Sequence, residues 1–244
     1  MKINSGIKNK TAIRVIFILA AVILLVQTYP VPAQTSDTLI YKKNPNYELQ
    51  MGMFDLYKTK QADIVMLGNS LTAGANWAEL LGRSNVVSRA IPGDILQGFN
   101  ARMDLVFKLK PKIVFIMGGL NDIYGWIPVN VVYTNYLRII TALQARGIIP
   151  VIQLTTYATK DYGKDWGGTP ETNRGRNREV DKLDKLLSDY AGRNGIDVIN
   201  LLPSIATKDG YLKPELTWDG VHFKPEAYKI WAREVENVLR KHKM

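Results

Sequence analysis

The sequence predicts an α/β protein, a three-layer α/β/α sandwich around a parallel sheet. Short, unbroken apolar runs follow residue 62, and segments with helical periodicity separate them. Strands of a parallel sheet are buried on both faces, so they read as continuous rather than alternating apolar runs. The chain has 244 residues, 46% of them hydrophobic, which is enough for one domain with a sizeable core.

Five strands are predicted, each from a short apolar run: 64–67, 86–87, 113–117, 148–154 and 196–201. Helical periodicity predicts helices between and after them: 77–81, 98–109, 129–146, 176–193 and 225–241. Pro111 stops the second helix, Gly147 caps the third and Gly195 ends the fourth. Residues 157–175 are expected to form a long glycine-rich loop, and such loops are usually functional or mobile.

The N-terminus has the pattern of a secretory signal peptide. Lys2, Lys8, Lys10 and Arg14 precede the apolar run 15–26, and small or compact residues lead to a cleavage point after Ala33, ahead of Gln34. We therefore expect a signal peptide over 1–33, a partly helical lead-in segment over 34–61 and the main domain over 62–244, in a secreted or periplasmic protein. The alternative is an uncleaved membrane anchor that places the domain outside the cytoplasm; only in that case is the membrane a partner.

Composition excludes several classes of function. The chain has no cysteine, which removes disulfides and thiol nucleophiles, and its two histidines are too few for a histidine-rich metal site. The net charge is +10, but the basic residues are spread along the chain rather than clustered in a stripe, so no nucleic-acid partner is expected. No dinucleotide or P-loop glycine motif occurs. We expect no metal and no cofactor.

Ser70 stands at a predicted strand-to-helix turn, in Gly68-Asn69-Ser70-Leu71. On its own, such a serine is usually a helix cap. The same place suits a nucleophile, because the hydroxyl lies at the positive end of the helix dipole and the serine N–H can face a developing oxyanion. A serine nucleophile needs a base, which is usually histidine.

The base is expected to be His222, which lies just before the terminal helix. The other histidine, His242, lies in a basic C-terminal tail that we expect to be poorly ordered. Asp219 is three residues before His222 and can hold its ring, which would complete a Ser–His–Asp triad. The alternative is a structural histidine anchored by an aspartate.

Two further strand-end loops contain candidate oxyanion donors. Asn121, in Gly119-Leu120-Asn121-Asp122, can donate its side-chain amide, and Gly93 offers an N–H with no side chain in the way. Each residue has an ordinary alternative as a cap or turn residue. All of these residues follow strands of one predicted sheet, at the edge where ligands bind in such folds. The combination favours an enzyme.

The ordered set Gly-x-Ser-Leu, a loop Gly, Gly-x-Asn-Asp and Asp-x-x-His resembles the GDSL/SGNH hydrolase superfamily, most closely its platelet-activating-factor acetylhydrolase-like branch of small esterases. The resemblance covers about residues 63–239 and implies a flavodoxin-like fold. It also implies Ser70 as nucleophile, His222 as base and Asp219 as its orienting group. The oxyanion hole it implies consists of the Ser70 N–H, the Gly93 N–H and the Asn121 side chain. One departure is Asn69, where the family usually has aspartate.

The expected function is therefore a serine esterase that removes short acyl groups, most of all O-acetyl groups, from a small-molecule or oligosaccharide ester. Four tryptophans near the predicted site are candidates for stacking on sugar rings, although tryptophan is also a core residue: Trp77, Trp126, Trp166 and Trp218. The alternatives are a thioesterase or lysophospholipase-type activity on the same residues, and a carbohydrate-binding protein that keeps the fold without turnover.

Overall fold

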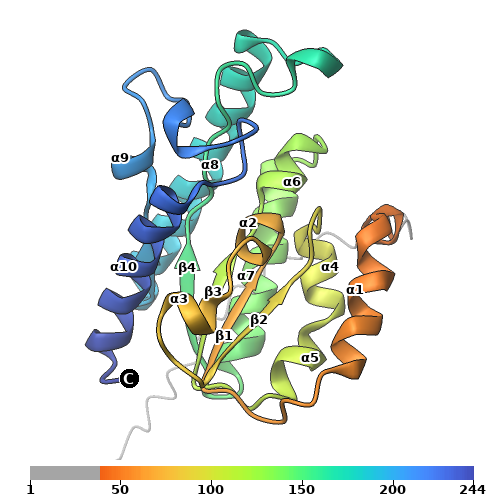
Figure 1. Ribbon diagram of the computed structural model, residues 1–244, viewed down its shortest axis with the longest axis vertical. Helices are drawn as coiled ribbons and strands as arrows, with labels where there is room; N and C mark the ends of the chain where they lie inside the picture. Colours follow the sequence, from red (N-terminus) through yellow and green to blue (C-terminus); the bar gives the residue numbers. More distant parts are fainter. Residues whose placement is uncertain (1–38) are drawn as a thin grey trace, which may run out of the picture. The chain divides into compact units, whose positions relative to one another are not determined.

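A computed structural model describes residues 39–244, and in it the predicted parallel sheet is confirmed (Figure 1). The five strands are β1 (Ile64–Gly68), β2 (Val86–Ala90), β3 (Ile113–Met117), β4 (Ile149–Gln153) and β5 (Asp197–Ile199). All neighbouring pairs are parallel, in the order β2-β1-β3-β4-β5. The predicted signal peptide, 1–33, and the start of the lead-in segment lie outside the described residues.

The register of the sheet places three strand ends side by side. Gly68, the last residue of β1, pairs with Ala90 of β2 and with Met117 of β3. The loops after these strands therefore leave the sheet at neighbouring points of its carboxyl edge, the edge where open α/β sheets bind ligands. Every residue of β1 and β3 is buried, as their continuous apolar sequences predicted.

Helices cover both faces of the sheet. The short α3 (Trp77–Leu80) lies on the same face as the terminal helix α10 (Pro225–Lys241), where the Trp77 and Trp231 rings meet edge to face with centroids 4.8 Å apart. The opposite face has α4 (Leu96–Ala101), α5 (Met103–Phe107), α7 (Val129–Gln144) and α8 (Pro170–Asn194). The remaining short elements are α2 (Ser70–Ala73), α6 (Leu120–Tyr124), η2 (Lys164–Trp166), α9 (Leu202–Ile205) and η3 (Pro214–Leu216).

Some boundaries differ from those predicted. The expected helix 98–109 is two helices, because Arg102 breaks the periodicity with φ −117° and ψ 17° and turns its side chain into the core. Helix α8 begins at Pro170 rather than at residue 176, where a capping box between Thr169 and Thr172 starts it. The loop expected over 157–175 is correspondingly shorter. Strand β2 runs on to Ala90.

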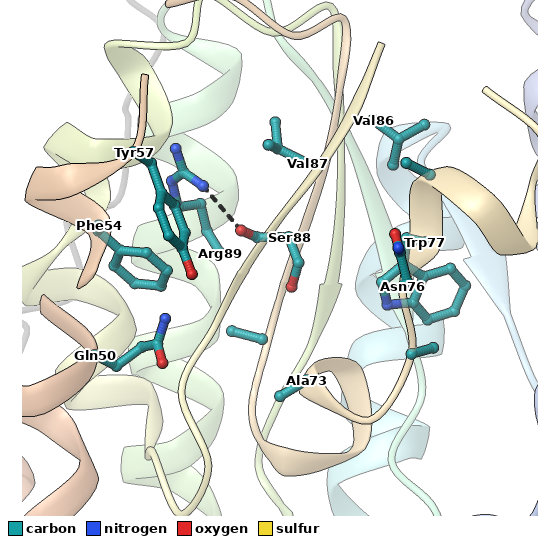
Figure 2. Close-up of a pocket in the computed structure, with 13 residues that line it drawn as sticks. Gln50, Phe54, Tyr57, Ala73, Asn76, Trp77, Val86, Val87, Ser88 and Arg89 are labelled. Atoms are coloured by element: carbon teal, nitrogen blue, oxygen red, sulfur yellow. Dashed lines mark hydrogen bonds between the residues drawn. The ribbon is translucent and has the colours of Figure 1, made fainter. Parts of the chain in front are cut away.

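The lead-in segment packs beside the edge strand β2. It contains η1 (Ile40–Lys43) and α1 (Pro45–Leu56), and Tyr47 and Phe54 of α1 bury themselves with Ile91 in a small second core. A cavity of about 360 Å³ lies between α1 and β2, lined in part by Phe54, Tyr57 and Arg89 (Figure 2). Helix α1 thus packs at the end of β2, through Ile91 and through the Arg89 guanidinium, which lies 5.1 Å from the centroid of the Phe54 ring.

The C-terminal tail continues α10 and is bound to the sheet, so the expectation that it is poorly ordered is wrong. His242 is the C-cap of α10, and its Nε2 lies 2.6 Å from Asp197 Oδ2. Asp197 begins β5, so this contact lies at the amino edge of the sheet, opposite the strand-end loops. His242 therefore lies at the edge of the sheet where the strands begin, whereas Ser70 lies at the edge where they end. Among residues 39–244 no helix is long and apolar enough to cross a membrane.

Candidate active site

Ser70 is the first residue of α2, directly beyond the end of β1. The side chain of Asn69 accepts a hydrogen bond from the Leu71 N–H at 3.1 Å and so caps the helix. Asn69 is 2% exposed. The capping alternative therefore applies to Asn69 and leaves the Ser70 hydroxyl available. Capping needs only a side-chain oxygen, which asparagine supplies as well as the aspartate usual in the family.

The Ser70 hydroxyl meets the ring of His222. Ser70 Oγ lies 2.9 Å from His222 Nε2, and His222 Nδ1 lies 2.6 Å from Asp219 Oδ2. The other Asp219 oxygen accepts the Val221 and His222 backbone N–H groups at 2.9 and 2.8 Å. Partial burial alone would raise the pKa of Asp219, but its hydrogen bonds from the His222 ring and these N–H groups outweigh burial and hold that pKa below its usual value. An ionised Asp219 places the ring proton on Nδ1 and leaves Nε2 free to accept.

A closed turn presents the histidine. Thr217 Oγ1 donates to the His222 carbonyl at 2.7 Å and accepts from the Gly220 N–H at 2.9 Å. Gly220 has φ +101°, and a Cβ there would lie 2.6 Å from Thr159 Oγ1, so only glycine fits. The Trp218 ring stacks on the His222 ring with centroids 5.5 Å apart and planes at 20°. The turn thus fixes the backbone of His222, and the Trp218 ring fixes one face of its imidazole.

The three predicted oxyanion donors lie on adjacent loops at the carboxyl edge. In the described part of the chain, the Ser70 and Gly93 N–H groups make no hydrogen bond, so both are available to a ligand. Asn121 Nδ2 donates one hydrogen to the Asp94 carbonyl at 2.8 Å, which fixes the amide and leaves its second hydrogen free. Asn44 and Asn46 of the lead-in segment hold the loop from outside, through hydrogen bonds to the Pro92 carbonyl at 2.8 and 3.3 Å.

A buried charge network beneath these loops was not predicted. The side chains of Arg102 and Asp94 are fully buried and form an ion pair, Nε to Oδ2, at 2.9 Å. The same guanidinium donates to the Arg89 carbonyl at 2.8 Å and to the Gly68 carbonyl at 3.2 Å. Arg102 therefore joins the ends of β1 and β2 to the Gly93-Asp94 loop. A Cβ on Gly98 would lie 1.9 Å from Asp94 Oδ1, so this packing requires glycine there.

A second buried carboxyl, that of Asp122, lies beside this ion pair and binds the start of α4. Its carboxyl accepts the Leu96 N–H at 3.1 and 3.3 Å, which ties the start of α4 to α6. Burial raises the pKa of Asp122 to about 7, against the opposing effect of this backbone hydrogen bond. Burial likewise raises the pKa of Asp94 to about 6, although Arg102 lies beside it. Sequence alone could not show these groups as buried, since Asp122 is bound by a backbone N–H 26 residues away and Asp94 by an arginine side chain from the end of the next helix.

The four candidate tryptophans divide into two groups. Trp77 is 1% exposed, and its Nε1 donates to the Thr72 carbonyl, so it is a core residue and the substrate-binding prediction for it is wrong. Trp126, Trp166 and Trp218 are 69%, 79% and 69% exposed. Large aromatic side chains so exposed commonly mark binding surfaces. Of these three, Trp218 lies directly against the histidine.

Comparison with known proteins shows the family to which the chain belongs. The family described as GDSL-like Lipase/Acylhydrolase matches residues 66–230, more than half of the chain. A GDSL-like lipase from Bacteroides thetaiotaomicron superposes with a TM-score of 0.68 at 20% identity, over 81% of this chain and 98% of that one. An acetyl xylan esterase superposes with a TM-score of 0.58 at 18% identity, over 72% and 99%.

One curated protein also aligns, the N-acylneuraminate cytidylyltransferase of Streptococcus agalactiae. It is 24% identical over 131 residues, which make up 51% of this chain. The chain thus matches only 29% of that relative's length.

Proposed function

The chain belongs to the GDSL-like lipase/acylhydrolase family and is an ester-hydrolysing enzyme, and from this premise we propose that it removes short acyl groups, chiefly O-acetyl groups, from carbohydrate outside the cytoplasm. Ser70 is the nucleophile, His222 the general base and Asp219 the group that orients His222. The observation that carries the proposal is the unbroken hydrogen-bonded chain from Ser70 Oγ through the His222 ring to Asp219 Oδ2.

The proposed mechanism follows from which atoms hold protons. His222 Nε2 takes the Ser70 proton as Oγ attacks the ester carbonyl carbon, and Asp219 stabilises the imidazolium that forms. The tetrahedral intermediate collapses when Nε2 returns the proton to the leaving sugar hydroxyl, which leaves an acyl-Ser70. Water, deprotonated by the same nitrogen, then releases the acid and restores Ser70. In both steps the Ser70 and Gly93 N–H groups and the Asn121 side chain stabilise the oxyanion.

Asn121 serves in this mechanism as one of three donors to the oxyanion. Asn121→Ala should lower kcat by about 10²–10³-fold, with little change in KM, because the interaction strengthens only as negative charge develops. Steady-state kinetics on an acetyl ester measures this. Asn130→Ala is the matched control, since Asn130 is exposed at the start of α7. A rise in KM at constant kcat would assign Asn121 to substrate binding instead.

Support for a carbohydrate substrate comes from the exposed aromatic rings. Trp218, stacked on His222, adjoins the point where the leaving group must accept its proton. Aromatic faces pack well against the apolar faces of sugar rings while leaving their hydroxyls in water. Trp126 and Trp166 extend the same kind of surface on the loops around the site.

Acyl-chain preference tests the proposed substrate class. We expect kcat/KM to be highest for acetyl esters and to fall steeply beyond about four acyl carbons, in a series of 4-nitrophenyl esters and of acetylated and butyrylated sugars. A preference for long acyl chains would contradict the deacetylase proposal and favour the thioesterase or lysophospholipase alternative. Absence of turnover on every ester would favour the binding-protein alternative.

Export has its own test. Cleavage of the predicted signal peptide after Ala33 should give an exported protein whose first residue is Gln34. N-terminal sequencing of the protein recovered outside the cytoplasm measures this. A sequence that begins at Met1 or Lys2 would show that the segment is retained, in agreement with the anchor alternative.

A further inference from the structure

Arg176, near the start of α8, has a guanidinium without a polar partner in the described part of the chain. Its Nε is buried, and the N–H there donates no hydrogen bond to any described residue. Arg174, on the same helix, instead donates to the Gly210 carbonyl at 3.0 Å. A guanidinium is always charged and carries five N–H donors. Because a half-buried cation is normally paired, an unpaired one invites a ligand that can accept those hydrogens.

Aromatic rings hold the Arg176 side chain in place. Its guanidinium carbon lies 4.4 Å from the centroid of the Tyr124 ring and 4.8 Å from that of Trp126. Such cation–π contacts orient the guanidinium without using its N–H donors. Trp126 adopts φ +59°, a left-handed conformation that is unfavourable for a bulky residue, so the fold keeps this ring beside Arg176 at a conformational cost.

This cluster adjoins the catalytic residues on two sides. Tyr124 belongs to α6, one turn after Asn121. The Tyr124 ring also meets the Tyr162 ring edge to face at 5.4 Å. A Cβ on Gly220 would lie 3.1 Å from Tyr162 Cβ, so Tyr162 packs directly on the turn that carries Asp219 and His222. The packed rings of Tyr162 and Tyr124 therefore connect the turn that carries Asp219 and His222 to Arg176.

We propose that Arg176 is the specificity-determining residue of an anion subsite, which selects sugar esters whose ring carries a carboxylate. The guanidinium would bind the carboxylate, which matches its planar donor geometry, while the sugar ring packs on the exposed Trp126. This inference rests on the proposed carbohydrate esterase function and names the chemistry of its substrate.

Two acetylated sugars that differ in one group test the subsite. The probes are acetylated methyl glucuronoside, which carries the carboxylate, and acetylated methyl glucoside, which carries a hydroxymethyl group instead. We expect the wild-type protein to show a kcat/KM about 10- to 100-fold higher for the glucuronoside, the range typical of one charge-assisted hydrogen-bonded pair. Added salt should reduce the preference, since the subsite is partly open to solvent.

Variants of Arg176 show whether this residue causes the preference. Arg176→Met should bring the ratio of the two kcat/KM values close to one, and Arg176→Lys should recover part of it because the charge is kept. Arg178→Met is the matched control: it removes the same charge from an exposed position of α8 and should leave the ratio as in the wild type. Equal rates on both sugars in the wild type, or an unchanged ratio in folded Arg176→Met, would overturn the proposal.

A binding measurement separates this proposal from the function on which it rests. Unacetylated methyl glucuronoside should bind the Ser70→Ala protein in calorimetry or NMR titration, and methyl glucoside should bind at least about tenfold more weakly. If neither acetylated sugar is hydrolysed by the wild type but this difference in binding persists and depends on Arg176, the carbohydrate esterase function is wrong and the anion subsite stands. If both sugars are hydrolysed but bind equally, the subsite alone is wrong.

Discussion

Ser70→Ala and His222→Ala should each lower turnover of an acetyl ester by at least about 10³-fold, and the double variant should be scarcely slower than either single one. The reason is that the two residues act as a unit in the proposed mechanism, in which His222 Nε2, 2.9 Å away, takes the proton of the weakly nucleophilic Ser70 hydroxyl. Residual activity would come from the oxyanion donors and substrate binding.

Single-turnover and steady-state kinetics on the purified variants measure the effect, with circular dichroism to confirm folding. His242→Ala is the matched control, because it removes the other histidine, which lies at the opposite edge of the sheet and pairs with Asp197. Its kcat should stay at the wild-type value. Wild-type turnover in folded His222→Ala, or losses that add independently in the double variant, would contradict the proposed mechanism.

Arg102→Met should lower the free energy of unfolding by about 3–5 kcal/mol. The substitution leaves the Asp94 carboxylate buried without its cation, and the remaining partner of a broken buried ion pair is strongly destabilising. It also removes the donors to the Gly68 and Arg89 carbonyls, so the loops that carry Ser70 and Gly93 lose a shared support. We therefore expect kcat to fall together with stability.

The loss in Arg102→Met should depend on pH. Burial already raises the pKa of Asp94 to about 6, and loss of Arg102 removes an interaction that opposes this rise. The folded variant then binds more protons than the unfolded chain above the ordinary aspartate pKa. Its free energy of unfolding should therefore be highest in acid and fall as pH rises toward the folded-state pKa, by up to about 1.4 kcal/mol per pH unit.

Urea unfolding at pH 5 and pH 8, followed by tryptophan fluorescence, tests both statements. Asp94→Asn/Arg102→Met is the informative control, because it removes both charges and should recover much of the stability lost at pH 8. A loss below 1 kcal/mol in Arg102→Met, or one that is equal at the two pH values, would show that Asp94 has another source of compensation.

The parts of the fold that the sequence predicts well are those that depend on local pattern. Strands such as β1 and β3 are buried on both faces, so burial leaves a continuous apolar run that can be recognised directly. The start of α8 was placed too late because its capping box stands in a polar, glycine-rich stretch with no apolar periodicity. Arg102 was expected inside one helix, since periodicity does not reveal a charged residue that turns into the core.

The candidate site shows the same division. Ser70, His222 and Asp219 could be proposed from residue type, spacing and a count of histidines, and the structure brings them within hydrogen-bonding distance. His242 was correctly excluded as the base, but the reason is different from the one expected. It lies at the amino edge of the sheet, bound to Asp197, and not in a poorly ordered tail. The Arg102 network and the aromatic surroundings of Arg176 depend on contacts between segments far apart in sequence, which no local pattern contains.

The hydrogen bonds from Asn44 and Asn46 to the Pro92 carbonyl bear on where the functional domain begins. The family match starts at residue 66, so a boundary drawn from it would remove α1 and these two side chains. Such a truncation would also remove Ile64 and Val65 of β1, and the Gly93 loop would lose its outer support. For this chain, we therefore expect a fully active protein to need residues from Asn44 onward, ahead of the start of the family match.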